Sequence, residues 1–152
     1  MHTDQIQLKA IQASVHPFCL VCSGSNPYGL ALKFDVNDDG SVTASFTGTS
    51  VVEGFQGLLH GGTIASLLDG AMTNCLFAHG LAAVTAELKV RYHKPVAIGC
   101  EMIVRAWMEK PYPPLYFMQA ELKQEGCVKA VASAKFMERN ERNNSPHDAG
   151  RK

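Results

Sequence analysis

The segment from Gly61 to Gly80, GGTIASLLDGAMTNCLFAHG, constrains the fold most strongly, because it has helical spacing but almost no polar face. Asp69 is its only formally charged residue. The segment is too short, and too often interrupted by Gly, Asn and Asp, to cross a bilayer. The rest of the chain therefore has to surround this helix. Its apolar residues recur three and four positions apart: Ile64, Leu67, Leu68, Ala71, Met72, Cys75 and Leu76.

Around this helix the sequence has the period of two that is typical of strands with one buried face. Two links between strands, PYPP and the Glu125–Gly126 turn, are too short for crossover helices, so these strands should be antiparallel. NDDG suits a hairpin turn between the first two segments. We predict an α+β protein in which a curved antiparallel β-sheet wraps a long central α-helix. The expected strands are 30–36, 42–46, 84–92, 100–108, 116–122 and 128–136.

Charge and hydropathy exclude several classes of partner. Acidic and basic residues balance at 14 each, which gives no electrostatic reason to expect nucleic acid or a membrane surface. The N-terminus lacks the basic and apolar regions of a secretory signal, and no long apolar run occurs. We therefore expect a soluble, cytoplasmic protein.

The five cysteines are an odd number and are spread along the chain, so we expect a reducing compartment and no disulfide framework. Cys19 and Cys22, with His16 three residues before Cys19, have a spacing at which thiolates and an imidazole can share a metal ion. A structural tetrahedral site usually brings a second clustered pair. We therefore predict no metal site, although the spacing leaves the question open.

The start of the long helix suggests chemistry. A helix N-terminus offers free backbone N–H groups and about half a positive charge, which suits an oxygen that is becoming negative. Gly61 and Gly62 allow another molecule to approach those groups closely. Asp69 follows two helical turns later, where a stable helix rarely places an aspartate. The sequence thus contains a candidate oxyanion hole and a candidate catalytic carboxylate, although a buried helix can also tolerate one hydrogen-bonded Asp.

The run GFQGLLHGGTIASLLDG, followed by TAELKVRYHKPV, resembles the hotdog-fold acyl-CoA thioesterases of the PaaI-like type. The shared features are the HGG motif, an aspartate nine residues after its histidine, and a Tyr-x-Lys-Pro strand end. The upstream CLVCSGSNPYGLALKF is similar to the leader of many of these proteins. The resemblance implies the hotdog fold, and hydrolysis of acyl-CoA to free acid and CoA without a cofactor. We expect a helical leader at 1–18, a hotdog thioesterase domain at 19–138 and a disordered tail at 139–152.

The resemblance also implies roles for single residues. Gly62 would bind the thioester carbonyl through its backbone N–H, and His60 would shape the turn or contact the substrate. Asp69 would act as the nucleophile or as the base that activates water. Thr85 would hold that water or orient the carboxylate. Because a thioester carbonyl is already electrophilic, one carboxylate and an oxyanion donor can suffice without a catalytic triad.

The chain departs from its relatives beside these residues. Some relatives have Asn where this chain has Gly54, and Gln56 could substitute for it in substrate binding. Others have Glu after the catalytic Asp, where this chain has Gly70. Arg91 and Lys94 are the candidate cations for the phosphates of CoA, and the alternative is that they merely form a solvated face of the sheet.

Strand parity and family resemblance together suggest an assembly. Thr85 lies on the face opposite Val84, Ala86 and Leu88, so we expect it to point away from its own helix. The resemblance implies a homodimer or homotetramer with sites between subunits, where the Asp69 of another copy would approach Thr85.

Two other functions stay open at this point. The chain could be a hotdog protein that binds acyl-CoA without turnover. It could also be a dehydratase or hydratase acting on acyl thioesters, although that chemistry normally needs a His and an acid at the substrate's α and β carbons.

Overall fold

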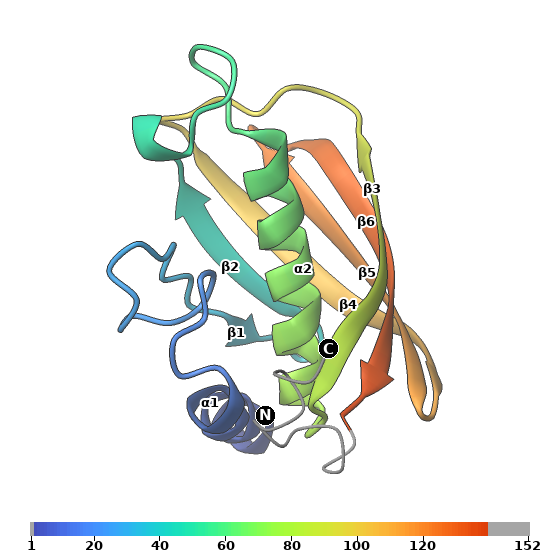
Figure 1. Cartoon of the computed structure of the whole chain (residues 1–152). Coiled ribbons are helices and arrows are strands. Elements are labelled where there is room, and N and C mark those ends of the chain that lie inside the picture. The colour runs from blue at the N-terminus through green and yellow to red at the C-terminus, as the bar shows by residue number, and fades with distance from the viewer. Residues whose placement is uncertain (1, 140–152) are drawn as a thin grey trace, which may run out of the picture.

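The computed structural model describes residues 2–139, and it folds as one long helix wrapped by a curved antiparallel sheet (Figure 1). The predicted hotdog architecture is confirmed. The strands pair in the order β1-β2-β4-β5-β6-β3, so β3 lies at the edge opposite to β1. The elements are α1 (His2–Val15), β1 (Asp35–Val36), β2 (Val42–Thr47), a 3-10 turn (Ser50–Val52), α2 (Gly61–Ala78), β3 (Ala83–Tyr92), β4 (Glu101–Tyr112), β5 (Leu115–Gln124) and β6 (Cys127–Glu138).

The core lies between α2 and the concave face of the sheet. From Gly70 to Ala78 every residue of α2 is buried. This burial agrees with the sequence, in which apolar residues occur on nearly all sides of the helix. The inward residues of β4, β5 and β6 alternate with outward ones and include several alanines, which let the helix approach closely. No helix within residues 2–139 is long and apolar enough to traverse a bilayer. The cytoplasmic location stays a prediction from sequence.

α2 ends at Ala78 because Gly80, at φ +77°, turns the chain out of the helix. The amides of Gly80 and Leu81 then donate to the carbonyls of Phe77 and Leu76, at 2.9 Å each. This pairing satisfies carbonyls that the helix end would otherwise leave free. The turn leads directly into β3, which therefore runs back along α2 (Figure 1).

The expected first hairpin is shorter than predicted. Its first strand is limited to the two residues of β1, and the segment 30–34 is not part of the sheet. The amides of Leu30 and Leu32 instead donate to the carbonyls of Leu20 and Val21, at 2.7 and 2.8 Å. The predicted strand 30–36 was right at 35–36 and wrong at 30–34, because residues 20–21, and not β2, accept the backbone hydrogen bonds of this extended segment.

The expected first helix is present as α1 and packs against α2. Leu8 is buried against the core, and the side-chain amide of Gln12 donates to Oδ1 of Asn74 on α2 at 3.0 Å. In Figure 1, α1 lies beside the C-terminal half of α2. Of the tail expected to be disordered, residues 140–152 lie outside the described part of the chain.

A β-bulge in β3 reverses the strand parity that the sequence suggested. The register against β6 shifts between Thr85 and Glu87, which leaves Ala86 as an extra residue. After the bulge, Leu88 and Val90 pack toward the core, whereas before it Thr85 faces α2. The prediction that Thr85 points away from its own helix was therefore wrong.

Candidate active site

Asp69 lies half-buried in the middle of α2, and its carboxylate has a partner from the edge strand. The Thr85 hydroxyl donates a hydrogen bond to Oδ1 of Asp69 at 2.6 Å. Burial raises the pKa of Asp69 above its usual value, and the Thr85 hydrogen bond opposes part of that rise. Such a carboxylate is a stronger base than an exposed one, and carboxyls with a shifted pKa are common in functional sites.

The HGG segment forms the N-terminus of α2. His60 caps the helix, because its Nδ1 accepts a hydrogen bond from the Gly62 amide at 2.9 Å. The Tyr92 hydroxyl donates to the Gly61 carbonyl at 2.7 Å and so ties this turn to the end of β3. Sequence reasoning gave Tyr92 no role. The Tyr-x-Lys-Pro strand end contains Tyr92 and was the sequence signal for it. Only the folded structure shows that its hydroxyl contacts the Gly61 carbonyl.

The helix start also retains unused donors. Among residues 2–139, no group accepts a hydrogen bond from the Gly61 or Thr63 amides. His60 is exposed, so its ring can move off the Gly62 amide when a better acceptor arrives. A cavity of about 410 Å³ opens beside this turn, between α2 and the residues that follow β3. It is lined mainly by apolar residues, together with His93 and Lys94: Phe55, Leu58, Leu59, Gly61, Ile64, Tyr92, Pro95 and Val96.

The other predicted substrate-binding residues are more scattered. Gln56 is exposed on the loop before α2, next to Phe55. Lys94 lines the cavity at the helix start, and its Nζ lies 3.6 Å from the Cys127 sulfur. Arg91 is exposed on β3 and alternates with the inward Val90, so it projects from the outer face of the sheet.

The carboxylate and the helix start lie apart within one chain. Asp69 lies seven positions after Gly62, and a rise of about 1.5 Å per residue puts their backbones roughly 10 Å apart along α2. Attack on a carbonyl needs the reacting atoms about 3–3.5 Å apart. The backbones of Gly62 and Asp69 of one chain thus lie two helical turns apart, and the two residues form separate parts of the candidate site.

The segment 16–34 that connects α1 to β1, called the leader from here on, packs against α2 next to the carboxylate. A Cβ on Gly70 would lie 2.6 Å from Cγ1 of Val21, so the leader occupies the space that a side chain at position 70 would need. Cys19 and His16 are close enough to influence the pKa of Asp69, the first raising it and the second lowering it. This packing explains why the chain has Gly70 where some relatives have Glu.

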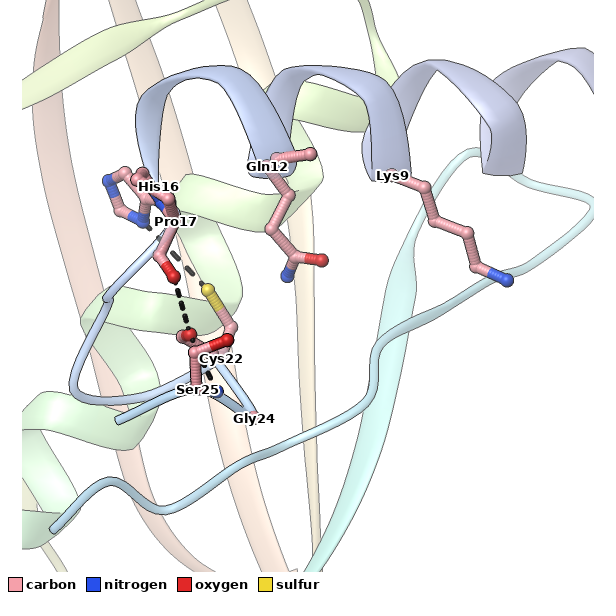
Figure 2. Close-up of a pocket in the computed structure, with 9 residues that line it drawn as sticks. Lys9, Gln12, His16, Pro17, Cys22, Gly24 and Ser25 are labelled. Atoms are coloured by element: carbon pink, nitrogen blue, oxygen red, sulfur yellow. Dashed lines mark hydrogen bonds between the residues drawn. The ribbon is translucent and has the colours of Figure 1, made fainter. Parts of the chain in front are cut away.

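His16, Cys19 and Cys22 form a cluster at the end of α1. His16 Nδ1 lies 3.8 Å from the Cys22 sulfur (Figure 2). A hydrogen bond from Cys22 lowers the pKa of the Cys19 thiol, and the same bond together with burial raises the pKa of Cys22. The two thiols therefore interact, and the proton is held more weakly by Cys19 than by Cys22.

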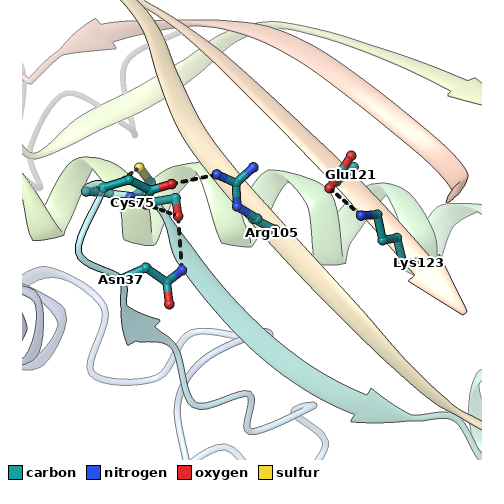
Figure 3. A network of polar contacts seen from close by, with 8 residues as sticks. Asn37, Cys75, Arg105, Glu121 and Lys123 are labelled. Carbon is teal, nitrogen blue, oxygen red and sulfur yellow. Dashed lines mark hydrogen bonds and ion pairs between the residues drawn. The ribbon is translucent and has the colours of Figure 1, made fainter. Parts of the chain in front are cut away.

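A second group of polar contacts lies away from these residues (Figure 3). Arg105 on β4 donates to Oδ2 of Asp39 at 2.8 Å, and the guanidinium also stacks over Trp107 at 4.8 Å. Asn37 donates to Ser41 at 3.0 Å within the turn that joins β1 to β2. These groups satisfy one another, and we assign them the structural role of holding that turn, whose Gly40 carbonyl also accepts from the Cys75 thiol of α2 at 3.6 Å.

A family model described as "Thioesterase superfamily" matches residues 56–137, which covers the helix start, Asp69, Thr85 and all four long strands. The chain belongs to the thioesterase superfamily. Among the relatives of this thioesterase-superfamily chain, bovine acyl-coenzyme A thioesterase THEM4 is 31% identical over 77 residues, which is 51% of this chain and 31% of the bovine protein. Mouse acyl-coenzyme A thioesterase 13 is 30% identical over 81 residues, 52% of this chain and 58% of the mouse protein. The chain thus spans between about a third and three fifths of these relatives' length.

Solved structures share the fold of this superfamily member. The E. coli PaaI protein from the phenylacetic acid degradation operon superposes with a TM-score of 0.76 at 18% identity, over 91% of this chain and 95% of that one. A Streptococcus mutans protein bound to acetyl CoA superposes with a TM-score of 0.67 at 16% identity, over 72% and 89% of the two chains. At these identities the likeness concerns the fold alone.

Proposed function

We propose that this thioesterase-superfamily chain hydrolyses acyl-CoA thioesters to a free acid and CoA, with Asp69 as the catalytic carboxylate. The observation that carries the proposal is the half-buried Asp69 with a raised pKa, held at 2.6 Å by the Thr85 hydroxyl. The names of the curated relatives, acyl-coenzyme A thioesterases, support the reaction. The acetyl CoA bound by the Streptococcus mutans protein supports the class of ligand.

The carboxylate supplies the base. In the direct route, Asp69 takes a proton from water while the water oxygen attacks the thioester carbon and the carbonyl electrons move to oxygen. The tetrahedral intermediate then collapses, the C–S bond breaks with its electron pair going to sulfur, and the proton passes from Asp69 to the CoA thiolate. In the covalent route, Asp69 itself attacks, CoA thiolate leaves, and water hydrolyses the anhydride. Thr85 orients the carboxylate in both routes.

The α2 N-terminus binds the carbonyl oxygen in this proposal. Its unused amides and positive dipole favour the oxyanion over the neutral carbonyl. When substrate binds, the Gly62 amide is predicted to donate its hydrogen bond to the substrate oxygen in place of His60 Nδ1. The exposed His60 ring has room to move away. Gly61 lets the substrate approach, and Tyr92 fixes the turn through the Gly61 carbonyl.

The separation of roughly 10 Å between the two halves of the site favours a homodimer or a higher homo-oligomer. One copy would supply the α2 N-terminus and the other would supply Asp69 and Thr85. The edge strand β3 is the candidate interface, because it carries the exposed apolar side chains Val84 and Tyr92 at its two ends. In this arrangement Lys94, at the mouth of the cavity, and Arg91 meet the phosphates of CoA, and Gln56 contacts the substrate near the carbonyl.

The experiment that tests this proposal is thiol release from a panel of short, long and aromatic acyl-CoAs. We expect wild type to turn over at least one class, and Asp69→Asn to lower kcat by about 100-fold or more with folding intact. Asp38→Asn is the matched control, because Asp38 is an exposed carboxylate in the β1–β2 turn. Binding of an acyl-CoA without turnover by wild type would overturn the proposal in favour of a binding protein, and hydration of an enoyl-CoA in place of thiol release would favour a hydratase.

A further inference from the structure

The cluster at the end of α1 has the geometry of a metal site. The ligand atoms of His16, Cys19 and Cys22 all lie within 4.8 Å of one another. Around a tetrahedral zinc ion, with Zn–S near 2.3 Å and Zn–N near 2.0–2.1 Å, neighbouring ligand atoms lie about 3.5–3.8 Å apart. The 3.8 Å separation of His16 Nδ1 from the Cys22 sulfur meets this spacing without the ion.

The surrounding residues hold the three ligands in place. The Val21 amide donates to the Cys19 sulfur at 3.3 Å, and such N–H donors to sulfur are typical partners of metal-bound thiolates. The His16 ring packs edge-on against Phe77, with ring centroids 5.0 Å apart and the rings at 87°, which fixes its orientation. Cys22 is buried at 8% exposure. The ligands are therefore pre-positioned, which lowers the entropic cost of binding an ion.

We propose that His16, Cys19 and Cys22 bind one Zn²⁺ ion, with a fourth position left for water. Two thiolates and an imidazole form a ligand set that suits zinc, whereas Mg²⁺ and Ca²⁺ take oxygen ligands. A cavity of about 320 Å³ borders the cluster (Figure 2) and provides room for the water. It is lined by Lys9, Gln12, Ala13, His16, Pro17, Cys22, Ser23, Gly24 and Ser25. Cysteine binds zinc as the thiolate, so zinc binding releases to solvent any proton that the two sulfurs carry.

The proposed ion fixes the loop that follows α1. Cys19 and Cys22 flank Val21, whose side chain rests on Gly70 next to Asp69. Zinc therefore fixes the loop 16–22, and Val21 in that loop packs against the turn of α2 that carries the carboxylate. Because the unfolded chain does not keep the three ligands together, zinc binding also stabilises the fold. This role is independent of whether the chain hydrolyses thioesters.

Metal binding is tested directly on the full chain. Protein purified under reducing conditions is stripped with a chelator and titrated with Zn²⁺ or Co²⁺, with metal content measured by mass spectrometry. We expect one ion per chain, thiolate-to-cobalt charge transfer with tetrahedral d–d bands, and a Zn²⁺-dependent rise in Tm. Cys22→Ser and His16→Asn should lose at least tenfold in affinity together with the rise in Tm. Cys100→Ser should keep both, because Cys100 is a half-buried cysteine outside the cluster.

Three results would overturn the proposal. The first is that the reduced, folded wild type fails to bind Co²⁺ or Zn²⁺ at one ion per chain. The cobalt spectrum could persist unchanged in both His16→Asn and Cys22→Ser. The purified protein could contain a Cys19–Cys22 disulfide and, after reduction, still take up no metal, which would identify the pair as a redox couple. His16→Asn leaves both cysteines intact, so it tests the site even if Cys22→Ser fails to fold.

Discussion

The Thr85 hydroxyl lies 2.6 Å from Oδ1 of Asp69, and this hydrogen bond joins the edge strand β3 to the middle of α2. The β-bulge at Ala86 makes the contact possible, because it turns Thr85 toward the helix while Leu88 and Val90 still face the core. The carboxylate is thus oriented by a residue 16 positions further along the chain. The proposed chemistry depends on this pair.

Removing the Thr85 hydroxyl should shift the pH dependence of activity. Asp69 acts as a carboxylate, so activity should fall as the pH drops through its raised pKa. The hydroxyl lowers that pKa, so Thr85→Val should move the acidic limb of the kcat profile to higher pH, and kcat should fall about tenfold or more. Thr85→Ser, which keeps a hydroxyl, should leave the limb in place. An unchanged limb in Thr85→Val would contradict the assigned role.

Asp69→Asn should make the protein more stable at neutral pH while it removes activity. Because the folded-state pKa of Asp69 is raised, its contribution to stability is present below the usual Asp pKa and is lost as pH rises through the folded value. Asn has no charge to bury, so we expect a gain of about 0.5–2 kcal/mol near neutral pH. Urea unfolding across a pH series should show this gain disappearing in acid. A less stable Asp69→Asn at neutral pH would refute the expectation.

The cap at the start of α2 should contribute measurably to stability. His60→Ala removes the acceptor for the Gly62 amide and should cost about 1 kcal/mol in the free energy of unfolding. His60→Asn offers another capping acceptor and should recover most of that loss. Equal losses in the two variants, measured by chemical denaturation, would show that His60 stabilises the turn by some other contact.

Gly70 should not tolerate a side chain. An Ala at this helical position would normally be favourable, but its Cβ would lie 2.6 Å from Cγ1 of Val21 and would force the leader away from α2. We expect Gly70→Ala to lower stability by about 1–3 kcal/mol. Gly24→Ala is the control, because a Cβ there meets nothing within 4 Å. A Tm for Gly70→Ala equal to or above that of wild type would mean that the leader moves aside at little cost.

Charge reversal at Lys94 and Arg91 should weaken binding of CoA esters. Exposed ion contacts contribute about 0.2–1 kcal/mol each, so Lys94→Glu and Arg91→Glu should each raise KM about twofold to tenfold with little change in kcat. The effect should shrink as salt is added. Lys110→Glu, on the distant β4–β5 hairpin, is the control. If KM stays constant in both variants, Lys94 and Arg91 do not bind CoA and only form part of a solvent-exposed face of the sheet.

The local pattern of apolar residues determined most of the secondary structure of this protein. The period of the apolar residues in 61–78 gave the central helix, and the alternation in four later segments gave four long strands, because burial of one face forces those periods. The same pattern isolated Asp69 as a charge in an apolar helix. Strand alternation alone misplaced Thr85 and assigned 30–34 to a strand, because the local pattern does not reveal which distant segment will accept a backbone hydrogen bond.

Tertiary structure decided the contacts between distant parts of the chain. The bulge at Ala86 depends on how β3 pairs with β6, and the Tyr92 bond to Gly61 depends on where β3 ends beside α2. The fit of Val21 on Gly70 likewise required the leader to fold back. The sequence by itself determined which residue types were available and which faces had to be buried, since periodicity is local. Only the folded chain decided which side chains meet, since register and packing are set by residues far apart in sequence.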